Sequence, residues 1–124
     1  MSARILVAED SLEIASFISD YLTMQGHQVD VVSDGLELMK KAEELHPQLI
    51  VTDIQMPGAF GSTAYTVLRK NESTKDIPII FVSGHPVESM MPKDPKIRFL
   101  DKPIDLKKFE RLLNELLSSD GPRP

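Results

Sequence analysis

Arg4-Ile5-Leu6-Val7-Ala8-Glu9-Asp10-Ser11 is the stretch that decides the fold, because a short apolar run ends in it at two acids and a serine. An uninterrupted apolar run of this length is typical of a strand that is buried on both faces of a parallel sheet. The apolar residues from Ile14 to Leu22 then repeat at helical spacing, and Asp10 or Ser11 can cap the first turn. The stretch therefore predicts a strand that leads directly into a helix.

The same alternation continues to the end of the chain. Gly26 suits the end of the first helix, and His46-Pro47 the end of the second. Five strands alternating with helices over short connections predict a doubly wound α/β domain with a mostly parallel sheet. We expect one domain over residues 1–124, with 118–124 as a flexible tail. The further predicted strands are 29–32, 49–52, 78–82 and 97–100, and the further predicted helices are 36–45, 62–71 and 106–117.

Composition excludes several classes of protein. The 124 residues include no cysteine, which rules out disulfide scaffolds, zinc–cysteine sites and thiol nucleophiles. No apolar stretch approaches the roughly 18 residues of a membrane helix, and the N-terminus has no signal-peptide pattern, so we expect a cytoplasmic protein without membrane contact. Residues 1–57 carry ten acids and only three bases, within a net charge of −5, so direct nucleic-acid binding is not expected.

Polar side chains follow four of the five predicted strands. Glu9 and Asp10 follow the first strand, Asp53 the third, Ser83 the fourth and Lys102 the fifth. In an open parallel sheet the carboxyl ends of the strands meet at one edge, where ligands bind. Three carboxylates placed together repel one another and tend to hold protons unless a cation neutralises them, and Mg²⁺ prefers carboxylate oxygens and water. One carboxylate can then attack phosphorus, while an ammonium and a hydroxyl bind the transferred group.

Each of these residues also has an ordinary role when it is taken alone. Asp10 is compatible with a helix cap, Asp53 with a turn and Ser83 with a strand-end hydroxyl. Their joint placement at four strand ends is what favours a phosphoryl-transfer site over these separate roles.

With these residues the chain resembles the receiver domain of two-component response regulators, of the stand-alone kind similar to chemotaxis regulators. The resemblance extends from Arg4 to Leu117. It implies the flavodoxin-like strand order 2-1-3-4-5. Four motifs carry it: Ile5-Leu6-Val7-Ala8-Glu9-Asp10, Asp53-Ile54-Gln55-Met56-Pro57-Gly58 followed by Gly61, Ser83-Gly84, and Lys102-Pro103.

The resemblance implies a role for each matching residue. Asp53 corresponds to the residue that accepts a phosphoryl group from a sensor histidine kinase or a phosphotransfer protein. Glu9, Asp10 and Asp53, with the backbone carbonyl of Gln55, correspond to the Mg²⁺ ligands. Such a domain promotes only its own phosphorylation and dephosphorylation, so it is not an enzyme in the usual sense.

The remaining implied roles concern the response to phosphorylation. Ser83 and Lys102 correspond to the pair that binds the phosphoryl oxygens, and Phe99 lies at the position of a switch aromatic. In similar domains the hydroxyl moves toward the phosphoryl group and the aromatic ring turns inward, which remodels a surface that a downstream protein target reads. Residues at the positions of Gln55 and His85 influence how fast the phosphoryl group is lost.

Two segments depart from the family pattern. Pro86, Pro92 and Pro95 restrict the fourth of the expected five helices to about 87–91, because proline disrupts a helix interior. Met90 and Met91 lie on this shortened piece. Ala59-Phe60 replaces the more usual apolar and acidic pair before Gly61. These changes put the usual output surface in question.

Three other functions remain as alternatives. A docking module of the same fold would keep these residues and work without phosphorylation. A Mg²⁺-dependent hydrolase of the haloacid dehalogenase type would also use an aspartyl phosphate, but it generally needs an acid where this chain has Gln55. A flavodoxin-like mononucleotide binder would need hydroxyl and glycine donors where Glu9 and Asp10 stand.

Overall fold

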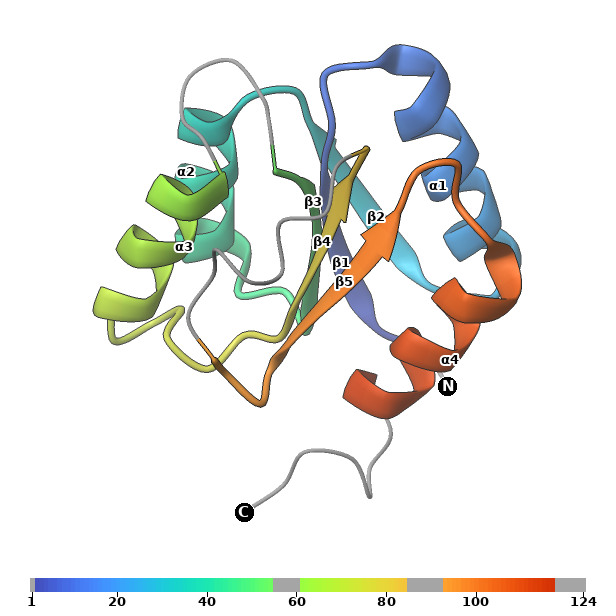
Figure 1. The fold of residues 1–124 in the computed structure, drawn as a ribbon. Helices are drawn as coiled ribbons and strands as arrows, with labels where there is room; N and C mark the ends of the chain where they lie inside the picture. Colours follow the sequence, from blue (N-terminus) through green and yellow to red (C-terminus); the bar gives the residue numbers. More distant parts are fainter. Residues whose placement is uncertain (1, 55–60, 85–92, 118–124) are drawn as a thin grey trace.

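The computed structural model describes residues 2–54, 61–84 and 93–117 of the chain. Strands and helices alternate through the first four strands, and the last described element is a helix (Figure 1). The predicted α/β alternation is therefore confirmed for the described residues. The strands are β1 (Arg4–Ala8), β2 (Gln28–Val32), β3 (Leu49–Asp53), β4 (Ile79–Ser83) and β5 (Ile97–Asp101), and the helices are α1 (Leu12–Met24), α2 (Gly35–Leu45), α3 (Gly61–Lys70) and α4 (Leu106–Leu117).

The five strands form one parallel sheet in the order β2-β1-β3-β4-β5, which confirms the expected order 2-1-3-4-5. Helices α1 and α4 cover one face of the sheet, and α2 and α3 cover the other (Figure 1). Each face has its own apolar core, because alternate residues of a strand point to opposite faces. Every residue of β3 and of β4 is buried, as expected for central strands covered on both faces.

Local chemistry sets the helix ends. Ser11 rather than Asp10 caps α1, since its hydroxyl accepts a hydrogen bond from the Ile14 amide at 3.3 Å. Gly26 has a φ of +92°, the left-handed region that glycine adopts without strain, and it follows the end of α1 as predicted. Asp34 caps α2 in the same manner as Ser11 caps α1. Asp10 is thereby left exposed and available for another role.

The expected short helix at 87–91 lies outside the described residues, and so do Phe60, His85, Met90, Met91 and the tail 118–124. Among the helices that the structure describes, none has the length and apolar character needed to cross a membrane.

An ion pair joins α3 to the segment that precedes β5. The Arg69 Nε donates to Asp94 Oδ2 at 2.8 Å, and both side chains are only 14% exposed. Burial alone would raise the pKa of the Asp94 carboxyl, but hydrogen bonds from Arg69, the Lys96 amide and Tyr65 outweigh it and lower the pKa below its ordinary value of 3.8. The folded state therefore favours the ionised carboxylate.

This pair predicts a pH dependence of stability. Because the folded pKa of Asp94 lies below the unfolded value, its stabilisation is fully present above the unfolded pKa and is lost as the pH falls through the folded pKa. We expect Asp94→Asn to lower the free energy of unfolding by about 1–3 kcal/mol at neutral pH and to flatten its acid limb below pH ~4. Urea titrations from pH 2 to 7 measure both effects. Asp76→Asn is the control, because the Asp76 side chain is 75% exposed and its ion pair is long; equal acid limbs in Asp94→Asn and the parent would contradict the assignment.

Candidate functional site

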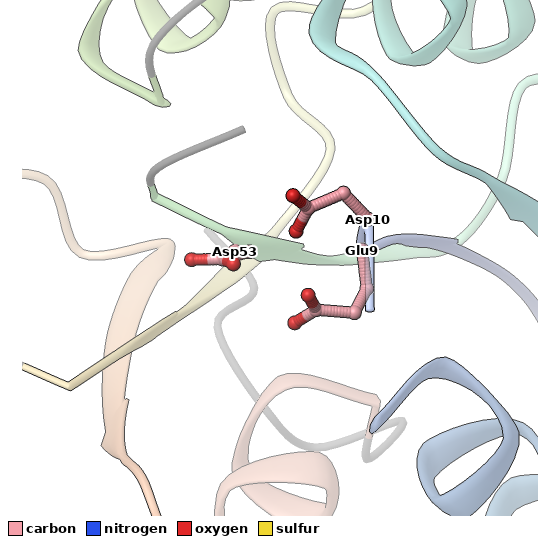
Figure 2. Close-up of side chains that lie close together, drawn as sticks. All are labelled: Glu9, Asp10 and Asp53. Carbon is pink, nitrogen blue, oxygen red and sulfur yellow. The ribbon is translucent and has the colours of Figure 1, made fainter. Parts of the chain in front are cut away.

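Three carboxylates meet at the carboxyl edge of the sheet. Glu9 follows β1 directly and is 2% exposed, and Asp53 ends the neighbouring strand β3 and is 7% exposed. Asp10 is exposed beside them. Figure 2 shows the three side chains projecting from these two strand ends toward a common region. One oxygen of each carboxylate lies within 4.8 Å of an oxygen of the others.

Lys102 binds two of these carboxylates from the other side of the site. It follows β5, and its Nζ donates to Asp53 Oδ2 at 3.1 Å and lies 3.3 Å from Glu9 Oε1. The Lys102 side chain keeps a quarter of its surface exposed, whereas those of Glu9 and Asp53 are buried. The ammonium therefore partly compensates two buried acids and remains accessible to an incoming group.

The environment of Glu9 disfavours the ionised form of its carboxyl group. Burial raises the pKa of the Glu9 carboxyl, and repulsion from the Asp53 carboxylate adds to this, against the opposing effects of the Ser11 amide and Lys102. The Ser11 amide donates to Glu9 Oε2 at 3.0 Å. The other oxygen, Oε1, is buried and has no hydrogen bond within the described part of the chain, although it faces the Lys102 charge.

The environment of Lys102, in contrast, favours the charged form of its side chain. Burial lowers the pKa of its ammonium, but the hydrogen bond and charge of Asp53, together with the charge of Glu9, outweigh burial and raise the pKa above its ordinary value. The side chain is therefore a fixed cation at neutral pH. A fixed cation beside a buried carboxylate is suited to binding an anionic group that arrives at that carboxylate.

Ser83 lies on the same edge. It ends β4, is 4% exposed, and accepts a backbone hydrogen bond from the Lys102 amide at 2.9 Å. The register pairs Asp53 with Val82, so Ser83 lies one residue beyond the partner of Asp53. The structure thus gathers Glu9, Asp10 and Asp53 at one edge, brings Lys102 into contact with Glu9 and Asp53, and places Ser83 on the same edge. Gln55 is outside the described residues.

The donor set fits a hard divalent cation. Carboxylate oxygens are the ligands that Mg²⁺ takes, together with water, and Asp10 keeps one side of the cluster open to solvent. A bound cation would contact the Glu9 Oε1 atom, which has no hydrogen bond among the described residues, and would reduce the repulsion between the Glu9 and Asp53 carboxylates. The described residues therefore fit Mg²⁺ held by Glu9, Asp10 and Asp53.

This fit predicts stabilisation by Mg²⁺. Ligand at a hundred times its dissociation constant adds about 2.7 kcal/mol to stability when it binds only the folded state. We expect the melting temperature of the parent to rise with Mg²⁺ and that of Asp10→Asn to rise little, measured by thermal unfolding over a Mg²⁺ series. Asp20→Asn is the matched control, because it removes an exposed acid from the same helix region without touching the cluster. An equal response of Asp10→Asn and Asp20→Asn would contradict the site.

Two features near the site were not predicted from the sequence. A pocket of about 340 Å³ beside Lys102 is lined mainly by apolar groups. Phe17, on α1, lines it and is 47% exposed, although its helical spacing resembles that of a core residue. Helical spacing places Phe17 on the apolar side of α1 but does not determine how far neighbouring elements cover it. The lining residues are Glu13, Ile14, Phe17, Lys102, Pro103 and Ile104.

Comparison with known proteins identifies the family. The family model of the response regulator receiver domain matches residues 5–114, so the chain belongs to the receiver domains of two-component response regulators. The polar-differentiation response regulator DivK of Brucella ovis is 27% identical over 123 residues, which cover 94% of this chain and 98% of that protein.

Two further comparisons agree. The probable transcriptional regulator ycf29 of Pyropia yezoensis is 30% identical over 128 residues, which cover 97% of this chain but 55% of that protein, so this chain spans about half the length of that relative. The solved receiver domain of the sensor histidine kinase PA1611 of Pseudomonas aeruginosa PAO1 has the same fold, with a TM-score of 0.85 at 23% identity over 96% of this chain and all of that one. In that structure a magnesium ion is coordinated in the active-site cleft.

Proposed function

We propose that this chain is a phosphorylation-dependent switch whose Asp53 accepts a phosphoryl group from a phosphohistidine of a sensor kinase or phosphotransfer protein. The observation that carries the proposal is the contact of one accessible cation, Lys102, with the buried carboxylates of Asp53 and Glu9. Membership of the receiver family supports it. A cytoplasmic location and a downstream protein target belong to the same proposal.

The chemical step is a transfer between two anions. An oxygen of Asp53 attacks the phosphorus of the donor, the bond between phosphorus and the donor nitrogen breaks, and the imidazole leaves with that electron pair. Lys102, already hydrogen bonded to Asp53 Oδ2, supplies positive charge where the phosphoryl oxygens arrive. The Ser83 hydroxyl is proposed to donate to another of these oxygens. When Mg²⁺ is bound, its positive charge would neutralise the clustered carboxylates and the phosphoryl oxygens.

The donor must touch the surface that borders Asp53. Because phosphorus has to come within bonding distance of a side chain that is 7% exposed, the donor protein must cover the rim of the site. The apolar pocket lies on this rim, because Lys102 is one of its lining residues. Leu12, the first residue of α1, is 82% exposed and precedes the lining residues Glu13 and Ile14 in the sequence. We propose that this pocket receives apolar side chains that flank the phosphohistidine of the donor.

The residues around Asp53 argue against the hydrolase alternative. A hydrolase needs a group that activates water once the aspartyl phosphate has formed. In hydrolases of the haloacid dehalogenase type an acid two residues after the acceptor generally serves this purpose, and this chain has Gln55 at that position. We therefore propose slow loss of the phosphoryl group, as a signalling switch requires.

Intact-mass spectrometry tests the proposal. The protein is incubated with Mg²⁺ and acetyl phosphate, a small phosphodonor, and its mass is followed over time. We expect a single phosphoryl adduct in the parent and none in Asp53→Asn. Many turnovers of acetyl phosphate per protein without an accumulating adduct would support the hydrolase, and complete absence of adduct would support a docking module that works without phosphorylation.

A further inference from the structure

Three aromatic rings are in contact on the sheet face that α2 and α3 cover. Phe81 of β4 is 1% exposed and stacks on Phe99 of β5, with ring centroids 5.8 Å apart and an interplanar angle of 25°. Phe81 also contacts Tyr65 of α3 edge to face, with ring centroids 6.3 Å apart and an interplanar angle of 62°. A continuous path of ring contacts therefore runs from β5 through β4 to α3.

One end of this path reaches the acceptor site. Side chains alternate along a strand, so Ser83 points to the same face of the sheet as Phe81. The register pairs Phe81 with Phe99 and Ser83 with Asp101. Ser83 is therefore the next residue of β4, after Phe81, whose side chain points to this face. A shift of Ser83 toward a group on Asp53 would therefore occur directly next to these rings.

The other end is fixed by charge. The Tyr65 hydroxyl donates to Asp94 Oδ2 at 3.0 Å, and Arg69 Nε donates to the same oxygen at 2.8 Å. The Arg69 guanidinium lies 5.4 Å from the centre of the Tyr65 ring and also donates to the Ile77 carbonyl at 2.8 Å. Tyr65 is thus held at its hydroxyl and over its ring. Phe99 is half-buried, and its hydrocarbon ring offers no hydrogen-bonding group of this kind.

One donor of this network is not satisfied. The Arg69 Nη2 is buried and has no hydrogen-bond partner among the described residues. A buried donor without a partner costs free energy, so within the described residues the guanidinium does not make every hydrogen bond that it can make.

We propose that Tyr65, anchored by Asp94 and Arg69, is the positioning residue that couples the Ser83 end of the sheet to α3 and to the segment before β5. The coupling rests on the proposed function, because phosphorylation of Asp53 is the event that it transmits. Since Phe81 is buried between its neighbours, a displaced Phe99 ring is accommodated at Tyr65. Linkage then requires the reverse effect as well: changing the Tyr65 anchor changes the affinity of the acceptor site.

Tyrosine fluorescence tests the coupling directly. The chain has two tyrosines and no tryptophan, so Tyr21→Phe leaves Tyr65 as the main fluorophore. Tyr21 lies on α1, and its hydroxyl donates to Glu110 of α4 at 3.3 Å, on the opposite face of the sheet from Tyr65. The reciprocal variant Tyr65→Phe keeps only Tyr21 and is therefore a matched control. Mg²⁺ with beryllium fluoride, which mimics a phosphoryl group on a carboxylate, is the probe. We expect the emission to change in Tyr21→Phe and to stay constant in Tyr65→Phe.

Fluorine NMR of bound beryllium fluoride separates the two ways in which this test can fail. A complex that forms while the Tyr65 emission stays constant would contradict the coupling alone. Failure of any complex to form, together with no acetyl phosphate adduct, would contradict the proposed function and the coupling with it.

Affinity gives a second readout that a merely structural role would not move. Residues on a coupling path typically change the coupling by amounts that correspond to about 2–30-fold in affinity. We expect the affinity of Tyr65→Phe for beryllium fluoride to differ from that of the parent by at least about twofold, and that of Tyr21→Phe to be unchanged. Asp94→Asn should shift the affinity in the same direction as Tyr65→Phe. Equal affinities in the parent, Tyr65→Phe and Asp94→Asn would overturn the proposal.

Discussion

Replacement of Lys102 by methionine is expected to reduce the rate of phosphorylation by acetyl phosphate by about 10²–10³-fold, the effect typical of removing one group that stabilises a developing charge. The reason is that Lys102 is the cation that contacts both Asp53 and Glu9 in the described part of the chain. Methionine keeps the unbranched apolar part of the lysine side chain and lacks its terminal ammonium, so the charge is the main property removed. Lys107→Met, on an exposed position of α4, is the matched control.

The same variant should also lose stability in buffer without Mg²⁺. Removing Lys102 leaves the buried Glu9 and Asp53 carboxylates beside each other without this cation, and we expect the free energy of unfolding to fall by about 2–4 kcal/mol. Added Mg²⁺ should restore much of that loss because it supplies positive charge to the same oxygens. Denaturant titrations with and without Mg²⁺ measure this effect; a phosphorylation rate like that of Lys107→Met would show that Lys102 has no part in transfer.

Replacement of Phe17 by aspartate is expected to reduce phosphoryl transfer from a protein donor by about 30-fold, the equivalent of one interface residue worth about 2 kcal/mol. Phe17 lines the apolar pocket on the rim of the site and has nearly half of its surface exposed. A charge there would meet the apolar side chains that we propose for the donor. Phosphorylation by acetyl phosphate, which needs no docking surface, should be unchanged.

Met24→Asp is the matched control for this prediction. Met24 is an apolar residue of the same helix, is 81% exposed, and lies at the end of α1 away from the site. The measurement is the rate of transfer from a radiolabelled histidine phosphotransfer protein that phosphorylates the parent. Equal rates for Phe17→Asp and Met24→Asp would place the docking surface elsewhere, and a loss with acetyl phosphate as well would indicate damage to the acceptor site instead.

The sequence was sufficient to predict the fold because its signals were local and mutually consistent. The apolar run before Glu9, the capping residues and Gly26 each act within a few residues, and the structure confirms the strands and helices that they predict. Boundaries shifted by a residue or so where a cap decides them. Asp34, for example, caps α2 so that the helix begins at Gly35 rather than at the predicted residue 36.

The positions of the candidate site residues could be predicted from the sequence, but the electrostatics of the cluster could not. The positions of Glu9, Asp10, Asp53 and Lys102 at strand ends follow from topology, since parallel strands bring their carboxyl ends to one edge. The unsatisfied Glu9 oxygen and the double contact of Lys102 depend on side-chain burial and distance, which spacing along the chain does not encode.

The ring path to Tyr65 could not be predicted for a related reason. Phe81, Phe99 and Tyr65 are separated along the chain and are brought together by the pairing of β4 with β5 and by the packing of α3. In the sequence Phe81 and Tyr65 are ordinary strand and helix positions, and the family resemblance singles out Phe99 alone. Asp94 likewise has the pattern of a loop acid, and its partners Arg69 and Tyr65 become evident only when α3 is placed against the sheet.

The central proposal is that Asp53 itself carries the phosphoryl group. Borohydride reduction after treatment with acetyl phosphate and Mg²⁺ tests it most directly, because this reagent converts an aspartyl phosphate into homoserine, which peptide mass spectrometry then locates. We predict homoserine at position 53, formed only when both donor and Mg²⁺ are present. Homoserine at position 10, or a stable adduct on a serine, threonine or histidine with Asp53 unmodified, would contradict the proposal.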